Sequence, residues 1–312
     1  MCVVGDIKDG IVSMNLQNLR VFLKVAELEH ITRAAEELHL TQPAVTKIIQ
    51  SLEQEAHLDL VERQGRRIVL THAGRVLQSY ARQMFSLERE MDDALAALRD
   101  VHRGEIKLAA NTTAGVYLLP SIVARFRALY PQIALNISIL NSQEIIDHIL
   151  DWSLDFGIVE GEVEHLPESL NVRFFTRDTL ILVAPPNHPW RGRDRVSAAG
   201  LGDHALLVRE PGSGVRDMLE RELTCRDIVL KPLLTLTDNE AIKQMVMNGV
   251  GAAVVSFLTV QRELASGDLV QIPLADMELR PELSFIQRPE KQLSRAAQAF
   301  FSFLFPLSAS PS

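Results

Sequence analysis

Cysteine and long apolar runs are both scarce in this chain. Only Cys2 and Cys225 occur among its 312 residues, and two such distant thiols support neither a disulfide framework nor a zinc cluster. The longest apolar candidate, residues 252–260, is about half of the ~18 residues that a membrane helix needs. We therefore predict a protein without a structural disulfide, a bound metal or a membrane span.

An excess of positive charge is missing as well. The formal net charge is −8 at pH 7, so the whole molecule is not a polycation that coats nucleic acid indiscriminately. Any binding to DNA must therefore come from a local basic patch. Residues 1–12 carry Asp6, Lys8 and Asp9 where a secretory signal needs an apolar core, which predicts a cytoplasmic location.

The composition that is present is that of an ordinary globular protein, with 47% hydrophobic and 23% charged residues. Its length allows two or three domains. The hydrophobic period indicates short helices and a hairpin in residues 16–72, one long helix in 73–100, and strands alternating with helices in 106–305. This order predicts a small module, a rod and a larger α/β body.

The small module begins with the pattern of three short helices. Residues 16–29 carry one apolar stripe, and a second helix follows with Thr32 as its expected cap. A third helix begins after Thr41, with Pro43 in the first turn, where a missing amide proton costs little. The tight turn between the second and third helices predicts a helix-turn-helix.

The third helix has a polar face opposite its apolar stripe. Gln42, Thr46 and Gln50 recur at four-residue steps with Lys47 beside them, and such short or bidentate groups suit the base edges of DNA. A polar helix face is more often simply solvated surface. Taken alone, this face is weak support for DNA binding.

A basic hairpin is expected directly after the third helix. Two short strand patterns flank residues 64–66, and the tip concentrates Arg63, Arg66 and Arg67. Over residues 14–72 as a whole the charges nearly cancel, with eight acidic against seven basic residues, so the positive potential lies at this wing and beside Lys47. An Arg-rich turn alone usually means nothing, but a helix-turn-helix followed by a basic wing predicts DNA binding.

The rod is predicted to run from a cap at Thr71 to about Arg99. Apolar residues recur along it at steps of three and four, as in a heptad seam. The seam comprises Leu77, Tyr80, Met84, Leu87, Met91, Ala94 and Leu98. The alternative is a helix that lies on the body of its own chain. The narrow seam and its charged flanks favour a partner helix, which predicts at least a dimer with two DNA-reading modules.

Residues 106–305 alternate between strand and helix patterns, which predicts a largely parallel, doubly wound sheet. The expected strands are 106–110, 134–140, 156–159, 180–184, 206–208, 252–255 and 283–286. The expected helices are 116–130, 143–152, 215–223, 240–248 and 294–303. Ligand sites of such sheets lie beyond the carboxyl ends of the strands.

Four strand-to-helix turns place hydroxyls, amides or backbone amide protons at a helix start, where a small anion is favoured. They are residues 111–113, 141–142, 209–216 and 238–239. In the third turn, Gly212 and Gly214 allow a close approach of the backbone, and Arg216 can add a charge-assisted contact. Each turn alone is explained as well by ordinary helix capping. Four turns that could converge on one crevice favour a ligand site.

Catalysis and metal binding find little support. Gly212-Ser213-Gly214 lacks the Gly-x-Ser-x-Gly spacing of a nucleophile elbow and the ending of a phosphate loop. His165, His188 and His204 have no metal-ligand spacing between them. We therefore expect no enzyme activity, no metal and no cofactor.

The chain resembles the LysR-type transcriptional regulators from residue 16 to residue 304. The likeness is strongest in residues 19–22, 32–38, 41–46, 52–53, 62–63 and 70–74. Residues 209–214 and 239–243 are similar to the branch that controls sulfur or carbon assimilation. Val215 departs from the Thr that is common after Gly-Ser-Gly, so one hydroxyl contact to the effector is missing. Residues 1–13 precede the usual start of the family.

The resemblance implies an α/β protein with an N-terminal winged helix-turn-helix, a long dimerisation helix and a two-lobed effector domain like that of periplasmic binding proteins. The expected bounds are 14–72 for the DNA-binding domain, 73–103 for the linker helix, 104–177 with 281–305 for lobe I, and 178–280 for lobe II. The implied DNA contacts are Thr32, Arg33, Gln42, Pro43, Thr46, Lys47, Gln50, Arg63, Arg66 and Arg67. The implied effector contacts are Thr112, Thr113, Ser142, Ser213, Arg216 and Asn239.

The expected partners are double-stranded promoter DNA, a small anionic metabolite, further copies of the chain in a dimer or a tetramer of two dimers, and RNA polymerase. The effector is expected to alter promoter binding or bending by biasing an existing conformational equilibrium. The competing hypothesis is a cytoplasmic solute-binding or enzyme domain without a role on DNA. Residues 106–305 would suffice for it, and the first hundred residues would stay unexplained.

Overall fold

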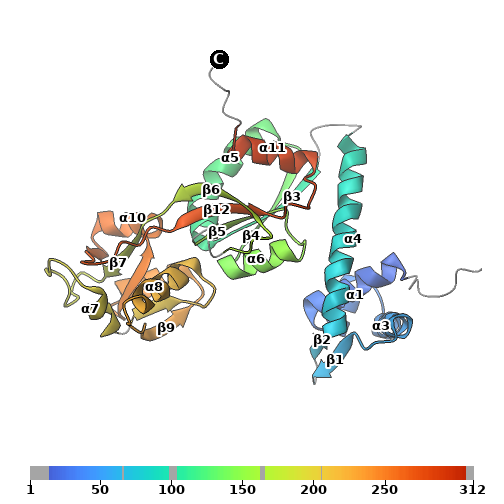
Figure 1. Cartoon of the computed structure of the whole chain (residues 1–312), viewed down its shortest axis with the longest axis horizontal. Coiled ribbons are helices and arrows are strands. Elements are labelled where there is room, and N and C mark those ends of the chain that lie inside the picture. Colours follow the sequence, from blue (N-terminus) through green and yellow to red (C-terminus); the bar gives the residue numbers. More distant parts are fainter. Residues whose placement is uncertain (1–13, 65–66, 98–103, 162–165, 205, 307–312) are drawn as a thin grey trace, which may run out of the picture. The chain divides into compact units, whose positions relative to one another are not determined.

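The computed structural model describes residues 14–64, 67–97, 104–161, 166–204 and 206–306, and the chain packs as two units that divide after Arg89 (Figure 1). The first unit contains three helices, a hairpin and most of a long helix. Its elements are α1 (Leu16–Leu28), α2 (Ile31–Glu37), α3 (Gln42–Ala56), β1 (Val61–Gln64), β2 (Arg67–Leu70) and α4 (His72–Ala97). The predicted order of three helices, hairpin and rod is confirmed.

The turn between α2 and α3 is held by side-chain caps. Thr41 Oγ1 accepts a hydrogen bond from the backbone N–H of Ala44 at 3.4 Å, and Pro43 occupies the first turn of α3, as predicted. The predicted cap of α2 is wrong. Helix α2 begins one residue earlier than Thr32, and the His30 side chain accepts the hydrogen bond from the backbone N–H of Arg33 instead.

The helices of the first unit pack around a small apolar core. Phe22 and Val25 of α1 and Val45 and Leu52 of α3 are fully buried there. Ala34, also fully buried, allows α2 to approach both helices closely. The helix-turn-helix is therefore held rigidly by the apolar stripes that the sequence shows.

The hairpin is fastened to α3 through one carboxylate. Glu53 Oε1 accepts hydrogen bonds from the backbone N–H groups of Leu60 at 3.0 Å and Val61 at 3.2 Å. The two strands pair antiparallel, with Val61 opposite Leu70 and Gln64 opposite Arg67. The wing therefore has a fixed base.

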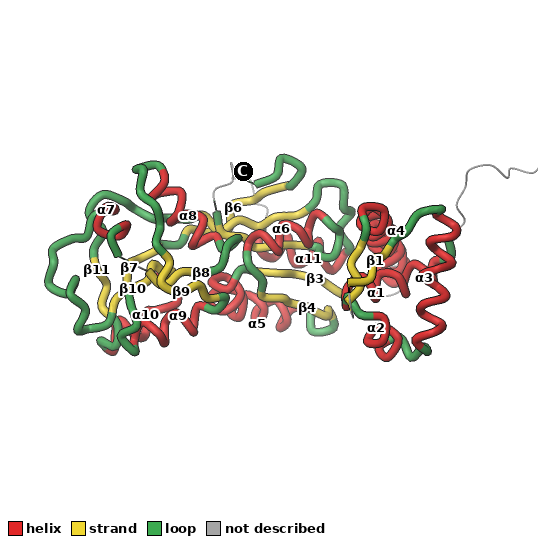
Figure 2. The backbone as a smooth tube through the Cα atoms, turned by 90° about the horizontal axis from the view of Figure 1, so that it is seen from below, coloured by secondary structure: helices red, strands yellow, loops and turns green. Residues whose placement is uncertain are grey.

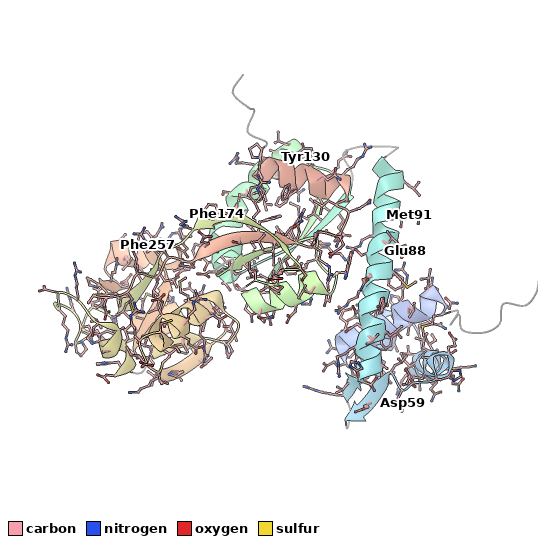
Figure 3. All side chains as sticks on the ribbon, viewed as in Figure 1. Asp59, Glu88, Met91, Tyr130, Phe174 and Phe257 are labelled. Atoms are coloured by element: carbon pink, nitrogen blue, oxygen red, sulfur yellow. The ribbon has the colours of Figure 1, made fainter. Side chains whose placement is uncertain are left out.

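Helix α4 has two apolar faces rather than one seam. Leu77, Ala81 and Phe85 pack against the core of the first unit, and the guanidinium of Arg20 lies 4.4 Å from the centre of the Phe85 ring. The opposite stripe is exposed along its length; Met91 lies on it in Figure 3. Its members are Val76, Tyr80, Met84, Leu87, Met91 and Leu95.

The predicted seam of α4 is therefore partly correct. Tyr80, Met84, Leu87 and Met91 are exposed as a partner helix requires, but Leu77 belongs to the inward face. The alternative, a helix that lies on its own chain, is also present, because the inward face of α4 packs against the core of the first unit. The Ala94 side chain and the whole of Leu98 lie outside the described residues.

The second unit contains two five-stranded sheets, each of which pairs parallel and antiparallel strands. The first has the order β4 (Ile133–Ile139), β3 (Gly104–Ala110), β5 (Phe156–Glu160), β12 (Glu282–Gln287) and β6 (Asn171–Arg177). The second has the order β11 (Val270–Ile272), β7 (Leu180–Ala184), β10 (Ala252–Ser256), β8 (Leu206–Arg209) and β9 (Pro232–Leu236). We call the parts built on these sheets lobe I and lobe II.

Helices cover both faces of these sheets; in Figure 2, α6 and α8 lie above the strands and α5, α9 and α10 below them. Lobe I carries a π-helical turn η1 (Ala114–Leu118), α5 (Leu119–Leu129), α6 (Ser142–Leu150) and α11 (Arg295–Leu304). Lobe II carries α7 (Ala198–Gly202), α8 (Gly214–Thr224), α9 (Asn239–Met247) and α10 (Phe257–Ser266). All seven predicted strands and all five predicted helices are present.

The sheets differ from the predicted largely parallel arrangement in one respect. Strands β7, β11, β12 and β6 enter their sheets antiparallel to a neighbour, because the chain crosses between the lobes twice. The crossings lie side by side, where Leu180 and Leu279 form an antiparallel bridge. The mixed sheets are thus a consequence of the two-lobed architecture.

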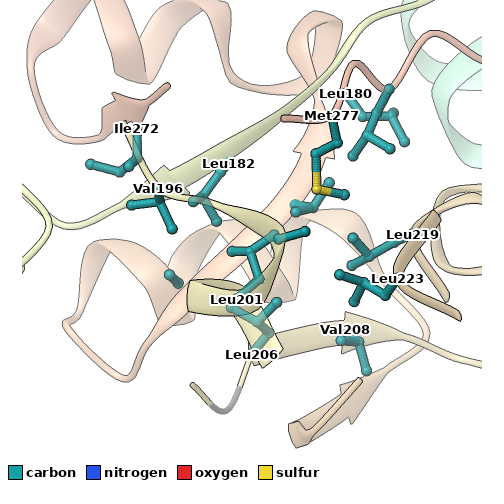
Figure 4. Packing of buried hydrophobic residues seen from close by; sticks show 14 of the residues in the cluster. Leu180, Leu182, Val196, Leu201, Leu206, Val208, Leu219, Leu223, Ile272 and Met277 are labelled. Atoms are coloured by element: carbon teal, nitrogen blue, oxygen red, sulfur yellow. The ribbon is translucent and has the colours of Figure 1, made fainter. Parts of the chain in front are cut away.

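Each lobe has its own apolar core. Lobe II packs α8 onto its sheet through Leu219 and Leu223, which belong to the same buried cluster as Leu182 and Leu206 (Figure 4). Lobe I gathers aromatic rings, with Phe126 and Phe300 in edge contact at 4.9 Å between ring centres. Within the described ranges, no helix is long and apolar enough to cross a membrane.

Candidate functional site

The outer face of α3 presents the predicted DNA-reading side chains to solvent. Gln42, Pro43, Lys47 and Gln50 are exposed, and Thr46 is half-buried among them. The other side of the same helix is buried in the core. Because one face is anchored, the polar face is held on a rigid support, as insertion into a DNA groove requires.

The other predicted DNA contacts lie around this face. Arg33 on α2 is exposed, and Thr32 beside it is half-buried. Arg67 is exposed at the start of β2. Arg63 occupies β1, but its side chain and the whole of Arg66 lie outside the described residues.

A small cavity forms where three helix starts of the second unit meet. Lobe I contributes residues that follow β3 and β4 and the last residue of β5, and lobe II contributes the last residue of β8 and the start of α8. The lining residues are Asn111, Thr112, Thr113, Asn141, Ser142, Glu160, Arg209, Ser213 and Gly214. The structure therefore brings together Thr112, Thr113, Ser142 and Ser213 from the predicted turns.

The lobes touch closely across this cavity. The backbone N–H of Gln143 in lobe I donates to the carbonyl oxygen of Gly212 in lobe II at 3.2 Å. A Cβ atom on Gly214 would lie 2.3 Å from the carbonyl oxygen of Glu160, so only glycine permits this approach. The empty space between these residues is about 190 Å³, including its open mouth.

Two of the predicted effector residues do not line the cavity. Arg216 Nε donates to Glu220 Oε1 at 2.7 Å, and its Nη1 donates to the carbonyl oxygen of Arg209 at 3.0 Å. Asn239 Oδ1 accepts from Arg209 Nη1 at 2.6 Å. Both residues therefore hold Arg209 rather than face the cavity.

Arg209 and Glu160 are the charged residues of the lining. Arg209 is buried, and Glu210 receives its Nε and Nη2 donors at 2.8 and 2.9 Å. Glu160 ends β5, is only 4% exposed, and accepts from Asn111 Nδ2 at 2.9 Å through Oε2. Neither residue was among the predicted contacts, although a single carboxylate at the end of an apolar strand was a readable signal.

The electrostatics of the cavity favour a neutral Glu160. Burial raises the pKa of this carboxyl to about 8, and the negative charge of Asp178 adds to the rise. Arg209 and the hydrogen bond from Asn111 oppose it and lower the pKa. Burial also raises the pKa of Asp178, while hydrogen bonds from Ser256 and the Thr179 backbone lower it.

The cavity carries no arrangement suited to metal chemistry. Across the described part of the chain, no three His, Cys, Asp or Glu side chains lie together as metal ligands would. What the lining offers is hydroxyls, amides, one buried guanidinium and the N-termini of α6 and α8, which suit a small polar anion.

Two family models together match nearly the whole chain. Residues 16–75 match the bacterial regulatory helix-turn-helix protein of the lysR family, and residues 99–306 match the LysR substrate binding domain. The RuBisCO operon transcriptional regulator of Allochromatium vinosum is 36% identical over 299 residues, which cover 95% of this chain and 97% of that protein.

Solved structures show the same fold. Full-length CbnR in complex with its target DNA has a TM-score of 0.65 and 22% identity, with 93% of this chain and 99% of that chain covered. The regulatory domain of CcmR from Synechocystis PCC6803, in complex with 2-PG, has a TM-score of 0.59 and 29% identity and covers 65% of this chain and 96% of that chain. On the two family models and the curated relative, this chain belongs to the LysR family of bacterial transcriptional regulators.

Proposed function

We propose that this protein is a LysR-type transcriptional regulator that reads promoter DNA with α3 and the β1–β2 hairpin, and whose DNA binding responds to a small anion held between lobes I and II. The observation that carries the proposal is the rigid, exposed polar face of α3. The same chain also contains a polar cavity that four turns of the second unit enclose or support. A solute-binding or enzyme domain does not require the exposed polar face of α3.

The proposed DNA contacts follow from side-chain chemistry. Gln42, Thr46 and Gln50 would read base edges, with Pro43 against them, because their groups lie on one face of a helix that fits the major groove. Lys47 would face the same groove, and Arg33 would contact phosphates beside it, with Thr32 next to Arg33. Arg63, Arg66 and Arg67 would contact phosphates or the minor groove from the wing.

Two copies of the protein would read one operator. The exposed apolar stripe of α4 has steps of three and four residues, which suits a second helix of the same kind. Leu87 is 66% exposed on this stripe, a high value for a leucine that has no partner in its own chain among the described residues. Two dimers would form the tetramer, and RNA polymerase is a further proposed partner.

The proposed effector is an anionic metabolite. Thr112, Thr113, Ser142 and Ser213 would contact it directly, while Asn239 and Arg216 act on it through Arg209. The CcmR regulatory domain, at 29% identity, was solved with 2-PG bound, and the likeness supports a small anion for this chain. The effector binds one arrangement of the lobes better than the other and so shifts their equilibrium.

Several further points belong to the same proposal. The protein acts in the cytoplasm and catalyses no reaction, and it needs no metal or cofactor. Its DNA-binding domain spans residues 14–72 and its linker helix 73–103. Lobe I spans 104–177 with 281–305, and lobe II spans 178–280.

A gel shift with the DNA upstream of its own gene tests the proposal, because many regulators of this family bind beside their own gene. The expected result is a shifted band at about 10 nM protein or less that a random duplex does not compete away. Lys47→Ala should weaken the shift, whereas the matched control Lys231→Ala, at an exposed lysine of lobe II, should not. Equal binding to both duplexes would contradict a regulator.

A footprint in the presence of metabolites tests the second half of the proposal. Phosphorylated sugars, sulfur compounds and organic acids are first screened by thermal shift for binding. The footprint is then repeated with each ligand that binds, and a changed protected region is expected. An unchanged footprint with every binding ligand would contradict the effector model.

A further inference from the structure

One buried oxygen in the cavity has no hydrogen-bond partner. Glu160 lines the cavity, and its Oε1 receives no donor from any residue in the described ranges. A buried polar oxygen without a partner is costly, so its place in a ligand cavity calls for an explanation. The hydrogen bonds around Glu160 decide which kind of partner is missing.

The orientation of Asn111 fixes the role of the other Glu160 oxygen. Asn111 Oδ1 accepts from the backbone N–H of Ala114 at 2.9 Å, so the opposite end of that side chain is the amino group. That amino group donates to Glu160 Oε2 at 2.9 Å. Oε2 is therefore the accepting oxygen of the carboxyl, and a proton on Glu160 belongs on Oε1.

The backbone of Glu160 is fixed as firmly as its side chain. Ser142 Oγ donates to the Glu160 carbonyl oxygen at 3.2 Å and accepts from the Glu160 N–H at 3.1 Å. Gly214 of lobe II lies against the same carbonyl group. Glu160 thus sits at the contact of the two lobes, beside the N-termini of α6 and α8.

We propose that Glu160 acts as a neutral carboxylic acid whose Oε1–H donates a hydrogen bond to the anionic group of the effector. This inference rests on the proposed effector site and names the group that selects for an anion there. An ionised carboxylate at this position would repel the ligand that Arg209 and the helix N-termini attract. The neutral acid instead adds a hydrogen-bond donor to Arg209 and the helix N-termini, so anion binding requires the proton on Glu160.

The charged groups that face Glu160 agree with this role. Asp178, at the crossing between the lobes, opposes its ionisation, and Arg209 of β8 favours it. Glu210 and Asn239 already occupy the guanidinium of Arg209, which limits how far that guanidinium can favour a charged Glu160. The pKa of about 8 that results leaves the carboxyl mostly protonated at neutral pH.

Sulfate is the probe for the test, because it stays doubly charged at every pH used. Its affinity for the full-length protein is measured by calorimetry from pH 6.5 to 9.5, at constant ionic strength. The wild-type affinity should fall at least about tenfold between pH 7 and 9.5, because each pH unit above the pKa of a required acid costs up to tenfold. Glu160→Gln keeps an N–H donor at the same place, and its affinity should stay flat over that range.

Infrared difference spectra of wild type and Glu160→Gln give an independent readout. The wild-type spectrum should contain a protonated carboxyl band at pH 7 that the variant lacks and that disappears above about pH 8. Asp178→Asn is the matched control, because it removes the neighbouring carboxyl. The charge of Asp178 also raises the pKa of Glu160, so in this variant the Glu160 band should remain at acidic pH and disappear at a lower pH than in the wild type. Loss of the band at every pH in this control would assign the proton to Asp178 and overturn the proposal.

Three other results would also overturn the inference. They are a Glu160 that is ionised at pH 7, a wild-type sulfate affinity that does not change with pH, and a failure of sulfate to bind at any pH. In the last case, a normal gel shift would show that the DNA-binding half of the proposed function stands by itself. A failed gel shift with pH-dependent sulfate binding would contradict the DNA role and leave the role of Glu160 intact.

Discussion

The proposed DNA-reading face of α3 and the cavity between the lobes place polar groups in opposite ways. On α3, Gln42, Lys47 and Gln50 are exposed on one side of a helix whose other side is buried. In the cavity, Asn111, Glu160 and Arg209 are themselves buried. The comparison teaches that a surface for a large, highly charged partner needs only a rigid support, whereas in a site for a small ligand each buried polar group needs a partner from the protein or from the ligand.

The largest effect is expected from a variant that separates the two copies of the protein, because binding to the operator depends on both copies. Leu87→Asp places a charge in the exposed stripe of α4 and should separate the dimer. Linked binding of two modules is worth about 10²- to 10⁴-fold in affinity, and the variant should lose that factor on its operator. Sedimentation measures the loss of the dimer, and a gel shift measures the loss of affinity for the operator.

The matched control for that variant is Glu88→Gln, which changes a charge on the same helix away from the stripe. Glu88 forms an ion pair with Arg20 within the first unit, so its loss should leave the dimer in place. If the Leu87→Asp protein is still dimeric and binds the operator normally, the proposal that α4 pairs the two copies is contradicted.

The next effect concerns the close contact of the lobes at the cavity, and it leaves the proposed DNA-reading face unchanged. Gly214→Ala places a methyl group 2.3 Å from the carbonyl oxygen of Glu160, so the lobes cannot approach as they do now. We expect at least about a tenfold loss of effector affinity, since a clash of this kind costs roughly 1–3 kcal/mol. Titration of a ligand found by thermal shift measures it.

Gly251→Ala is the control for Gly214→Ala. A methyl group there would meet the end of the half-exposed Leu233 side chain at 3.2 Å and would make an ordinary contact with Leu207 Cγ at 3.8 Å. Both variants should bind operator DNA like the wild type in the absence of effector. Normal effector affinity in Gly214→Ala would mean that the close contact of the lobes plays no part in binding.

The third effect concerns stability and pH. The pKa of Glu160 is higher in the folded protein than its ordinary value of 4.5, so folding favours the protonated form. Its stabilising contribution is fully present below about pH 4.5 and is lost as the pH rises through about 8. Asp178, whose pKa is also raised, acts in the same direction.

Chemical unfolding from pH 5 to 9 tests this sign. The free energy of unfolding should fall with rising pH by roughly 1–4 kcal/mol more in the wild type than in Glu160→Gln. Parallel pH profiles in the two proteins would show that Glu160 ionises in the folded state as it does in the unfolded chain.

The smallest effects are expected from variants that remove either one base contact or one phosphate contact. Gln42→Ala should cost roughly 1–3 kcal/mol on the operator and little on random DNA, because it removes a base-edge contact. Arg67→Ala should weaken binding to both duplexes and reduce the salt slope by about 1, because it removes a phosphate contact. Anisotropy titrations at several salt concentrations distinguish the two. An equal loss on both duplexes for both variants would contradict the assigned roles.

The sequence predicted the buried strands and the amphipathic helices well because their residues interact with a core. Strand β5 is one apolar run that ends in Glu160, and α3 alternates its two faces regularly. The strands that were missed are exposed or irregular. Strand β6 has Phe174 and Phe175 next to each other between Arg173 and Arg177, which breaks the alternation of a half-buried strand. Strand β9 begins with Pro232 and lies at the edge of its sheet.

The cavity could be predicted only in part, because its geometry comes from topology. The four turns were readable as helix starts, and three of them contribute lining residues. That Arg216 pairs with Glu220 was in principle visible, since the two are four residues apart on one helix. The contact of Gly214 with Glu160 joins two lobes that are distant in sequence, so no local pattern indicates it.

The most direct test of the central claim is a titration of operator DNA, with and without a ligand that binds the cavity, in wild type and in Gly214→Ala. We predict that both proteins bind the operator equally well without ligand, and that a ligand concentration which saturates the wild type changes the affinity or footprint of the wild type alone. A ligand response that is the same in both proteins, or absent in both, would contradict regulation of the DNA-reading face through the cavity between the lobes.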